Sequence, residues 1–211
     1  MPKNIDYSLY LVTDRDLIGK RSLTDVIQDA VKGGVTVVQL REKNCSTREY
    51  VEIAKKVKAI LSSSNVPLII NDRIDVAWAC RADGVHVGQN DMPYAEARRI
   101  LGPDAIIGLT VESESQALAA EDLDADYLGV STIYPTPTKT DTVYVWGIDG
   151  LNRLARKSRH HLVAIGGLNR DNTAEVIRAG AHGVAVVSAI CAADNPEAAA
   201  RDLRSIINSA R

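Results

Sequence analysis

Residues 161–188 read HLVAIGGLNRDNTAEVIRAGAHGVAVVS, and this stretch decides the fold class. Its two ends, 161–166 and 183–188, are short runs rich in Val, Ile and Ala, which are typical of buried parallel strands. The longer segment between them has helical character and leads through glycine into the second run. A strand, a helix and a strand in this order predict one repeat of an α/β fold.

The same order extends outward over the whole chain. KGGVTVVQL (32–40) and RADGVHVG (81–88) repeat it. Apolar residues three and four apart predict helices at 23–31 and 51–60, and Pro196 suits the start of a closing helix at 195–210. These units predict a single (β/α)8 TIM barrel with parallel strands, one catalytic domain over residues 1–211. An open doubly wound sheet stays an alternative. The predicted strands are 8–14, 35–41, 66–72, 84–88, 105–110, 126–131, 161–166 and 183–188.

Composition narrows the class of protein. The 25 Lys and Arg residues and 27 Asp and Glu residues leave a net charge of −2, so no nucleic-acid partner is expected. No apolar run has the length of a membrane span and the first residues lack a secretory pattern, so we expect no membrane partner and a cytoplasmic protein. Cys45, Cys80 and Cys191 are scattered, which indicates free thiols.

Polar residues stand where the predicted strands end, and in barrels this end carries the active site. The second strand runs into Gln39-Leu-Arg41-Glu-Lys43, and alternation places Gln39, Arg41 and Lys43 on one face, with Leu40 on the other. An amide with two cations predicts a site for an anionic ligand. The alternative is a surface cluster of ion pairs that includes Glu42 and Asp14.

Two carboxylates lie at the ends of neighbouring strands. Asn71-Asp72 closes the third predicted strand, and Asp91 follows the fourth. Carboxylates supply the hard oxygen ligands of Mg2+, which keeps other positions for water and substrate phosphate, so Asp72 and Asp91 are the predicted metal ligands. Helix capping by both aspartates is the alternative. His86, inside the fourth strand, is predicted to be a hydrogen-bonded core residue.

The last two strand ends are suited to phosphate. Gly166-Gly167 after the seventh strand would let backbone amides approach an oxyanion, and Val187-Ser188 after the eighth adds a hydroxyl. Glycines used for turn geometry and a serine used as a cap are the alternative.

One long connection, 132–146, predicts a lid. It carries Thr136, Thr138 and Lys139, and its two prolines reduce the entropy lost when it becomes ordered over a ligand. No Ser-His-Asp or Cys-His arrangement stands out, so acid–base work looks secondary. Cations and Mg2+ would chiefly stabilise a departing diphosphate.

Seven segments resemble the thiamine-phosphate synthase family over nearly the whole chain. In order they are YLVTD, GGVTVVQLREKN, LIINDRIDVA, GVHVGQNDMP, DYLGVSTIYPTPTK, VAIGGLN and GVAVVSAI. The resemblance implies a Mg2+-dependent TIM barrel that joins 4-amino-2-methyl-5-hydroxymethylpyrimidine diphosphate to a thiazole phosphate, giving thiamine monophosphate and pyrophosphate. It also implies that the carbon–oxygen bond breaks first and that the thiazole nitrogen captures a pyrimidine methylene cation.

The resemblance also implies roles for single residues. Arg41, Lys43 and Lys139 would be catalytic cations, and Asp72 and Asp91 the magnesium ligands. The implied contacts to the thiazole phosphate are Thr136, Pro137, Thr138, Gly167, Val187 and Ser188. The implied contacts to the pyrimidine diphosphate are Gln39, Leu40, Arg41, Glu42, Lys43, Asn71, Thr110 and Lys139.

The chain departs from the family pattern at two places, and two other functions remain as alternatives. Thr110 replaces the usual Ser, and Tyr144 and Trp146 make the end of the lid more aromatic. A related thiazole tautomerase would need the phosphate loops but not the cations around the diphosphate. A barrel that senses a phosphorylated metabolite without turnover would differ from both in the absence of activity. Whether the protein is a homo-oligomer is left open.

Overall fold

The chain folds into a closed barrel of eight parallel strands, seen in a computed structural model that describes residues 5–136 and 144–211. The strands pair in sequence order, and β8 pairs with β1 to close the barrel. This confirms the predicted (β/α)8 barrel over the open sheet. The strands are β1 (Leu9–Val12), β2 (Val37–Leu40), β3 (Leu68–Asn71), β4 (Gly84–Val87), β5 (Ile106–Val111), β6 (Tyr127–Ser131), β7 (Leu162–Ile165) and β8 (Gly183–Val186).

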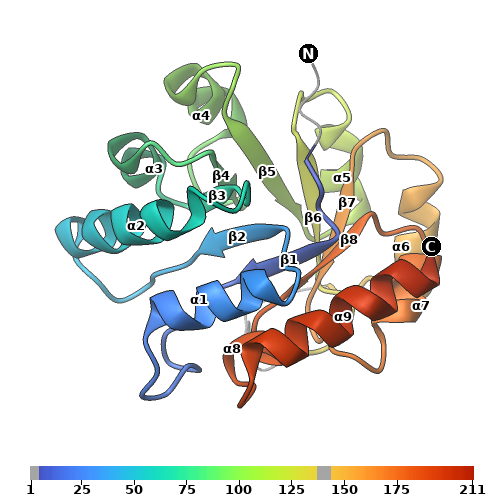
Figure 1. Ribbon diagram of the computed structural model, residues 1–211. Coiled ribbons are helices and arrows are strands. Elements are labelled where there is room, and N and C mark those ends of the chain that lie inside the picture. Colours follow the sequence, from blue (N-terminus) through green and yellow to red (C-terminus); the bar gives the residue numbers. More distant parts are fainter. Residues whose placement is uncertain (1–4, 137–143) are drawn as a thin grey trace.

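Helices surround the barrel (Figure 1). The predicted helices at 23–31, 51–60 and 195–210 are present, and the last of them, α9, packs beside α1 and α7. Asn195 caps α9 by accepting a hydrogen bond from Ala198 N at 2.9 Å. The described helices are α1 (Leu23–Lys32), α2 (Thr47–Leu61), α3 (Ile74–Cys80), α4 (Tyr94–Leu101), α5 (Glu114–Ala120), α6 (Gly147–Ala155), α7 (Thr173–Arg178), α8 (Ser188–Cys191) and α9 (Pro196–Ala210).

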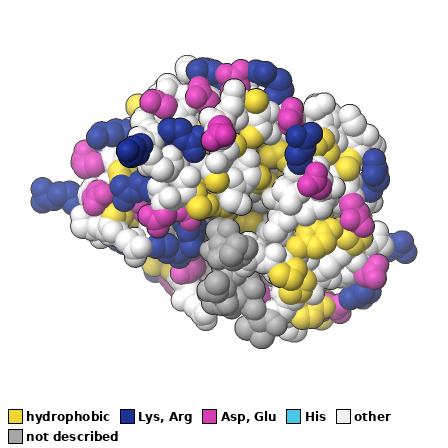
Figure 2. All heavy atoms as spheres, turned by 90° about the horizontal axis from the view of Figure 1, so that it is seen from below, with side chains coloured by type: hydrophobic (Ala, Val, Ile, Leu, Met, Phe, Trp, Pro, Cys, Tyr) yellow, Lys and Arg dark blue, Asp and Glu magenta, His cyan; other side chains and the backbone are white. Residues whose placement is uncertain are grey.

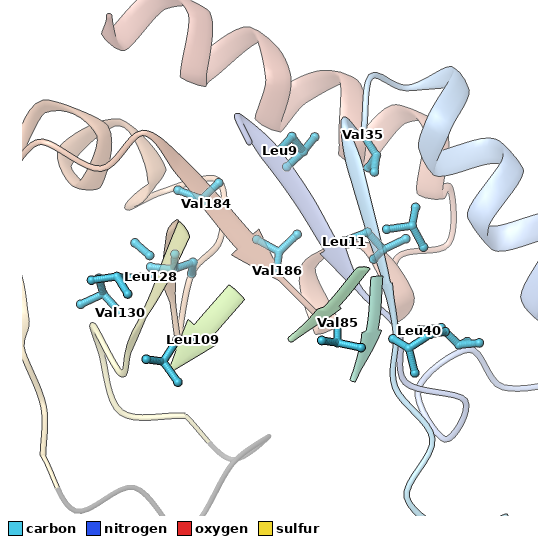
Figure 3. Close-up of a cluster of buried hydrophobic side chains, with 14 of the residues drawn as sticks. Leu9, Leu11, Val35, Leu40, Val85, Leu109, Leu128, Val130, Val184 and Val186 are labelled. Atoms are coloured by element: carbon cyan, nitrogen blue, oxygen red, sulfur yellow. The ribbon is translucent and has the colours of Figure 1, made fainter. Parts of the chain in front are cut away.

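Alternation along the strands divides the core into two layers. Leu9 and Leu11 of β1 belong to a large cluster between strands and helices, and Figure 3 shows their side chains with those of Val184 and Val186 from β8. Tyr10, between the two leucines, points into the barrel instead. The inner cluster consists of Tyr7, Tyr10, Val12, Val37, Ile69, Ile106, Tyr127, Val163 and Ala185.

Several strands end earlier than predicted, because the chain leaves the ladder where the polar residues begin. β2 ends at Leu40, one residue before Arg41. β3 ends at Asn71, and Asp72 adopts a left-handed backbone with φ of 62°, which a parallel ladder does not accommodate. β8 ends at Val186, and Ser188 begins α8. Arg41, Asp72 and Ser188 therefore stand just beyond the ladder, whereas Gln39 and Asn71 still belong to it.

The surface and the thiols agree with the composition. Figure 2 shows Lys and Arg side chains interspersed with Asp and Glu side chains over the face that it displays. Within the described ranges, no helix is both long and apolar enough to cross a membrane. Cys45, Cys80 and Cys191 are free thiols, as predicted, and burial raises the pKa of Cys191 to about 11.

Candidate active site

A cavity of about 430 Å3 lies where the strands end. A larger hollow of about 960 Å3, lined by Lys58, Arg81 and Asp83 among others, lies at the opposite end of the barrel, whereas the active sites of such barrels lie where the strands end. We therefore place the site in the smaller cavity, where polar groups from successive strands converge. Its lining includes Tyr10, Gln39, Arg41, Lys43, Asn71, Asp72, His86, Gln89, Asn90, Asp91, Thr110, Glu112, Tyr127, Ser131 and Val187.

Asp72 and Asp91 lie next to each other at this mouth. Asp72 accepts hydrogen bonds from Asn71 Nδ2 and Lys43 Nζ, each at 2.7 Å. Asp91 accepts from the backbone N–H of Gly88 at 2.8 Å. Burial raises the pKa of Asp91, and Asp72 raises it further because it lies within hydrogen-bonding distance and carries like charge. Two carboxylates that repel each other form a site whose charge a cation would balance.

Helix capping does not explain these aspartates. Arg73 occupies the N-cap position of α3, and Pro93 occupies that of α4. The donor set fits Mg2+, which is commonly held by one or two carboxylates with waters and substrate phosphates in its other positions. In the part of the chain that is described, no group of three or more His, Cys, Asp or Glu residues could hold a metal by itself. An ion held here would complete its coordination with oxygens of substrate, water or amide groups.

The cations of the second strand end face the cavity and are also paired with carboxylates. Arg41 Nη1 lies 3.6 Å from Asp14 Oδ2, and Lys43 is bonded to Asp72. The surface-cluster alternative is thus realised in part, yet both cations line the cavity. A ligand phosphate could replace the carboxylate as their partner, because the Lys43 and Arg41 side chains remain 51% and 27% exposed.

Two neighbours of these cations have side chains that point elsewhere. Leu40 packs in the outer core, as alternation predicted. Glu42 pairs with Arg15 at 2.7 Å, and its other carboxylate oxygen is buried without a hydrogen-bond partner among the described residues. Burial raises the pKa of Glu42, against the opposing effect of Arg15. These two residues could reach a ligand in the cavity only through their backbone.

The predicted phosphate residues lie at neighbouring strand ends. Gly167 has φ of +67°, and a Cβ there would lie 2.8 Å from Tyr134 Cβ, so turn geometry and close packing explain this glycine. Val187 lines the cavity, whereas Thr136, Gly167 and Ser188 are not part of its lining. Pro137, Thr138 and Lys139 lie outside the described residues, so the predicted lid is not tested by the structure.

Several residues of the cavity were not predicted from the sequence. Tyr10 and Tyr127 rise from inside the barrel to its floor, and His86, predicted to be a core residue, lies there with both ring nitrogens hydrogen-bonded to Tyr127 and Thr110. Gln89 also lines the cavity and donates to Thr110 O at 2.6 Å. Because alternate residues of a strand share a face, Val12 and Tyr10 point to the same side of β1, and this relation could have identified Tyr10.

A comparison with protein families decides what this barrel is. The model for thiamine monophosphate synthase matches residues 9–190. The chain belongs to this family. It is similar to the thiamine-phosphate synthase of Albidiferax ferrireducens, with 52% identity over 201 residues that cover 95% of this chain and 92% of the relative. It is also similar to that of Vibrio parahaemolyticus, with 50% identity over 202 residues that cover 96% and 98%.

A solved structure agrees with the thiamine monophosphate synthase family. The thiamine phosphate pyrophosphorylase from Pyrococcus furiosus shares 38% sequence identity with the chain at a TM-score of 0.90, over 97% of both chains. These relatives confirm the family that the seven segments indicated and the predicted enzyme class, a transferase of thiamine biosynthesis. Membership is consistent with a metal-dependent enzyme that acts on small molecules.

Proposed function

We propose that the chain is a thiamine-phosphate synthase that joins 4-amino-2-methyl-5-hydroxymethylpyrimidine diphosphate to a thiazole phosphate and releases pyrophosphate. The observation that carries the proposal is the convergence of Lys43, Asp72 and Asp91 at the mouth of one cavity in a chain of this family. A site that binds a metal–diphosphate complex needs carboxylates for the metal and cations for the phosphates, close together. Residues 1–211 would act as one catalytic domain in the cytoplasm.

The diphosphate would lie beside the second strand end. Arg41 and Lys43 would bind its oxygens, together with Lys139 from the connection after β6, and would stabilise the negative charge that grows as the carbon–oxygen bond breaks. Asp72 and Asp91 would hold Mg2+, which supplies further positive charge to the leaving group. The electron pair of the broken bond leaves with the diphosphate, and the thiazole nitrogen forms the new carbon–nitrogen bond.

The remaining predicted residues divide between the two substrates. Gln39, Asn71 and Thr110 line the cavity and are suited to the pyrimidine ring and its first phosphate. Leu40 and Glu42 would contribute backbone groups only. On the other side, Val187 with Ser188, Gly167 and the segment Thr136, Pro137 and Thr138 would bind the thiazole phosphate.

One assay tests this function. The purified chain is mixed with both phosphorylated substrates and Mg2+, and the release of pyrophosphate and thiamine monophosphate is followed. We expect both products in equal amounts and neither after Mg2+ is removed by a chelator. A parallel reaction without the pyrimidine substrate measures isomerisation of the thiazole phosphate. Isomerisation without condensation would identify the tautomerase instead, and binding of either substrate without turnover would identify a sensor.

A further inference from the structure

Five side chains form one line of hydrogen bonds across the floor of the cavity. Gln39 Nε2 lies 2.9 Å from Tyr10 Oη, and Tyr10 Oη lies 2.6 Å from Tyr127 Oη. From there the line continues to His86 Nδ1 at 2.9 Å, and His86 Nε2 lies 2.7 Å from Thr110 Oγ1. The five residues come from five strands, and all of them line the cavity.

The middle of this line is sealed from solvent. Tyr10 and Tyr127 are each 1% exposed. Burial raises the pKa of both phenols well above the usual range, so each keeps its single proton. The barrel also makes room for the line, because a Cβ at Gly108 would lie 2.1 Å from Tyr127 Cζ and 2.5 Å from His86 Nδ1. Gly108 thus permits the contact between the phenol and the imidazole.

The line has one direction, which starts at the Gln39 amide nitrogen, a group that can only donate. Tyr10 accepts this hydrogen bond. Either phenol can donate in the contact between Tyr10 and Tyr127, and we assign the donor role to Tyr10 because a phenol that accepts from Gln39 keeps its own proton for Tyr127. With this assignment, Tyr127 donates to His86 Nδ1, and the imidazole proton lies on Nε2 and is donated to Thr110. Gln39 Oε1 then stays an acceptor, and the Thr110 hydroxyl proton is not used within the line.

We propose that Tyr10, Tyr127 and His86 are positioning residues that hold the Gln39 amide in one orientation, and that they thereby select a 4-aminopyrimidine over its 4-oxo analogue. This inference rests on the proposed function. A 4-aminopyrimidine presents a donor, its amino group, beside an acceptor, ring nitrogen N3. A glutamine amide can pair with both, with Oε1 as the acceptor and Nε2 as the donor, as amides do with adenine.

The 4-oxo ring presents the opposite pattern, with a carbonyl acceptor beside a protonated N3. To pair with it, the Gln39 amide must turn over. Turning it over reverses every hydrogen bond of the line and moves the His86 proton from one ring nitrogen to the other. A partial reversal leaves a buried group unpaired, which is costly. A complete reversal makes the Thr110 hydroxyl donate to His86 Nε2, so the Thr110 proton is no longer available to the substrate. The hydrogen-bond line therefore disfavours binding of the 4-oxo ring, whereas an isolated glutamine amide would turn over without this cost.

The test compares three Tyr→Phe variants that each remove one buried hydroxyl. Tyr127→Phe and Tyr10→Phe cut the line between Gln39 and His86. Tyr7→Phe is the matched control, because Tyr7 is 4% exposed and contacts Tyr127 with tilted rings whose centroids are 4.8 Å apart, but it stands outside the line. For each protein, kcat/KM is measured with the 4-amino diphosphate and with its 4-oxo analogue at a saturating thiazole phosphate. If turnover of the 4-oxo analogue is too slow, its inhibition constant replaces kcat/KM.

We expect the preference for the 4-amino substrate to fall about tenfold in the Tyr10 and Tyr127 variants and to stay unchanged in Tyr7→Phe. A merely structural role would lower the rates with both ring types by the same factor, and that result overturns the proposal. An equal loss of preference in Tyr7→Phe also overturns it. If one variant does not fold, the other decides. Failure of the unsubstituted chain to condense the 4-amino substrate would count against the proposed function and not against the hydrogen-bond line.

Discussion

The ammonium group of Lys43 lies 2.7 Å from a carboxylate oxygen of Asp72. This contact joins the segment after β2 to the end of β3 and places a positive charge beside the pair formed by Asp72 and Asp91. Lys43 therefore neutralises part of the negative charge at the mouth before any ligand is bound. In the proposed complex, a metal ion would take over this carboxylate and the lysine would become available to a phosphate oxygen.

Asp72→Asn should lower turnover at least about a hundredfold, since it removes one proposed charged ligand of the metal–diphosphate complex. The Mg2+ concentration for half-maximal activity should rise as well. Steady-state rates over a magnesium titration measure both effects. Asp29→Asn is the control, because Asp29 pairs with Lys32 on α1, far from the cavity. Near-normal activity of Asp72→Asn at low Mg2+ would refute the metal role.

Lys139→Ala should also lower kcat at least about a hundredfold, because a cation that contacts the leaving group acts mostly in the transition state. Single-turnover measurements with the pyrimidine diphosphate separate this effect from product release. Lys32→Ala removes an equal charge on α1 and should leave the rate unchanged. Equal rates for the two variants would remove Lys139 from the proposed catalytic group.

Trp146→Phe should lower the free energy of unfolding by about 1 to 2 kcal/mol, the usual effect of losing a buried hydrogen bond and leaving its acceptor unpaired. The Trp146 indole is 4% exposed, and its Nε1 donates to Ser131 O at 3.1 Å. Urea unfolding measures the change. Tyr144→Phe, which alters a side chain 37% exposed, should have little effect. An equal loss in both variants would show that the indole hydrogen bond is not the cause.

The stability of the protein should decline as the pH falls below about 6.5, the ordinary pKa of histidine. Burial lowers the pKa of His182, with smaller effects from His161 and Arg211, and its Nδ1 accepts a hydrogen bond from Leu162 N at 3.0 Å. The unfolded chain therefore binds the proton first, and the loss is complete below the lowered pKa. In His182→Asn, the asparagine side-chain oxygen can accept the same hydrogen bond. The contribution of residue 182 to the pH dependence of the free energy of unfolding should therefore vanish. Urea unfolding at several pH values checks it, and an unchanged slope would exclude His182.

Local patterns in the sequence account for the fold because each unit encodes its own strand and helix. The alternation of side chains along the second strand predicted that Leu40 points away from the cavity and Arg41 towards it. The structure confirms both positions. The resemblance alone assigned Leu40 and Glu42 to the substrate, and their side chains do not line the cavity. The adjacency of Asp72 and Asp91 followed from the neighbouring ends of parallel strands.

Other features depend on partners far apart in the sequence. The hydroxyls of Tyr10 and Tyr127 are hydrogen-bonded although the two residues are 117 positions apart in the sequence. A local sequence pattern does not predict which inward-facing residues meet inside a barrel. His86 was therefore predicted to be satisfied, which is correct, but not to lie at the cavity floor. The left-handed backbone of Asp72, which turns the chain out of the ladder, suits an aspartate, but the residue type alone does not predict it.

The inner cluster has a practical consequence for engineering. The barrel interior contains no phenylalanine, as the chain has none, and its largest members are tyrosines, of which Tyr10 and Tyr127 line the cavity. Larger apolar side chains introduced into this interior to raise thermal stability would also change the floor of the cavity. Variants for industrial use should be sought in the helical shell, where packing and chemistry are separable.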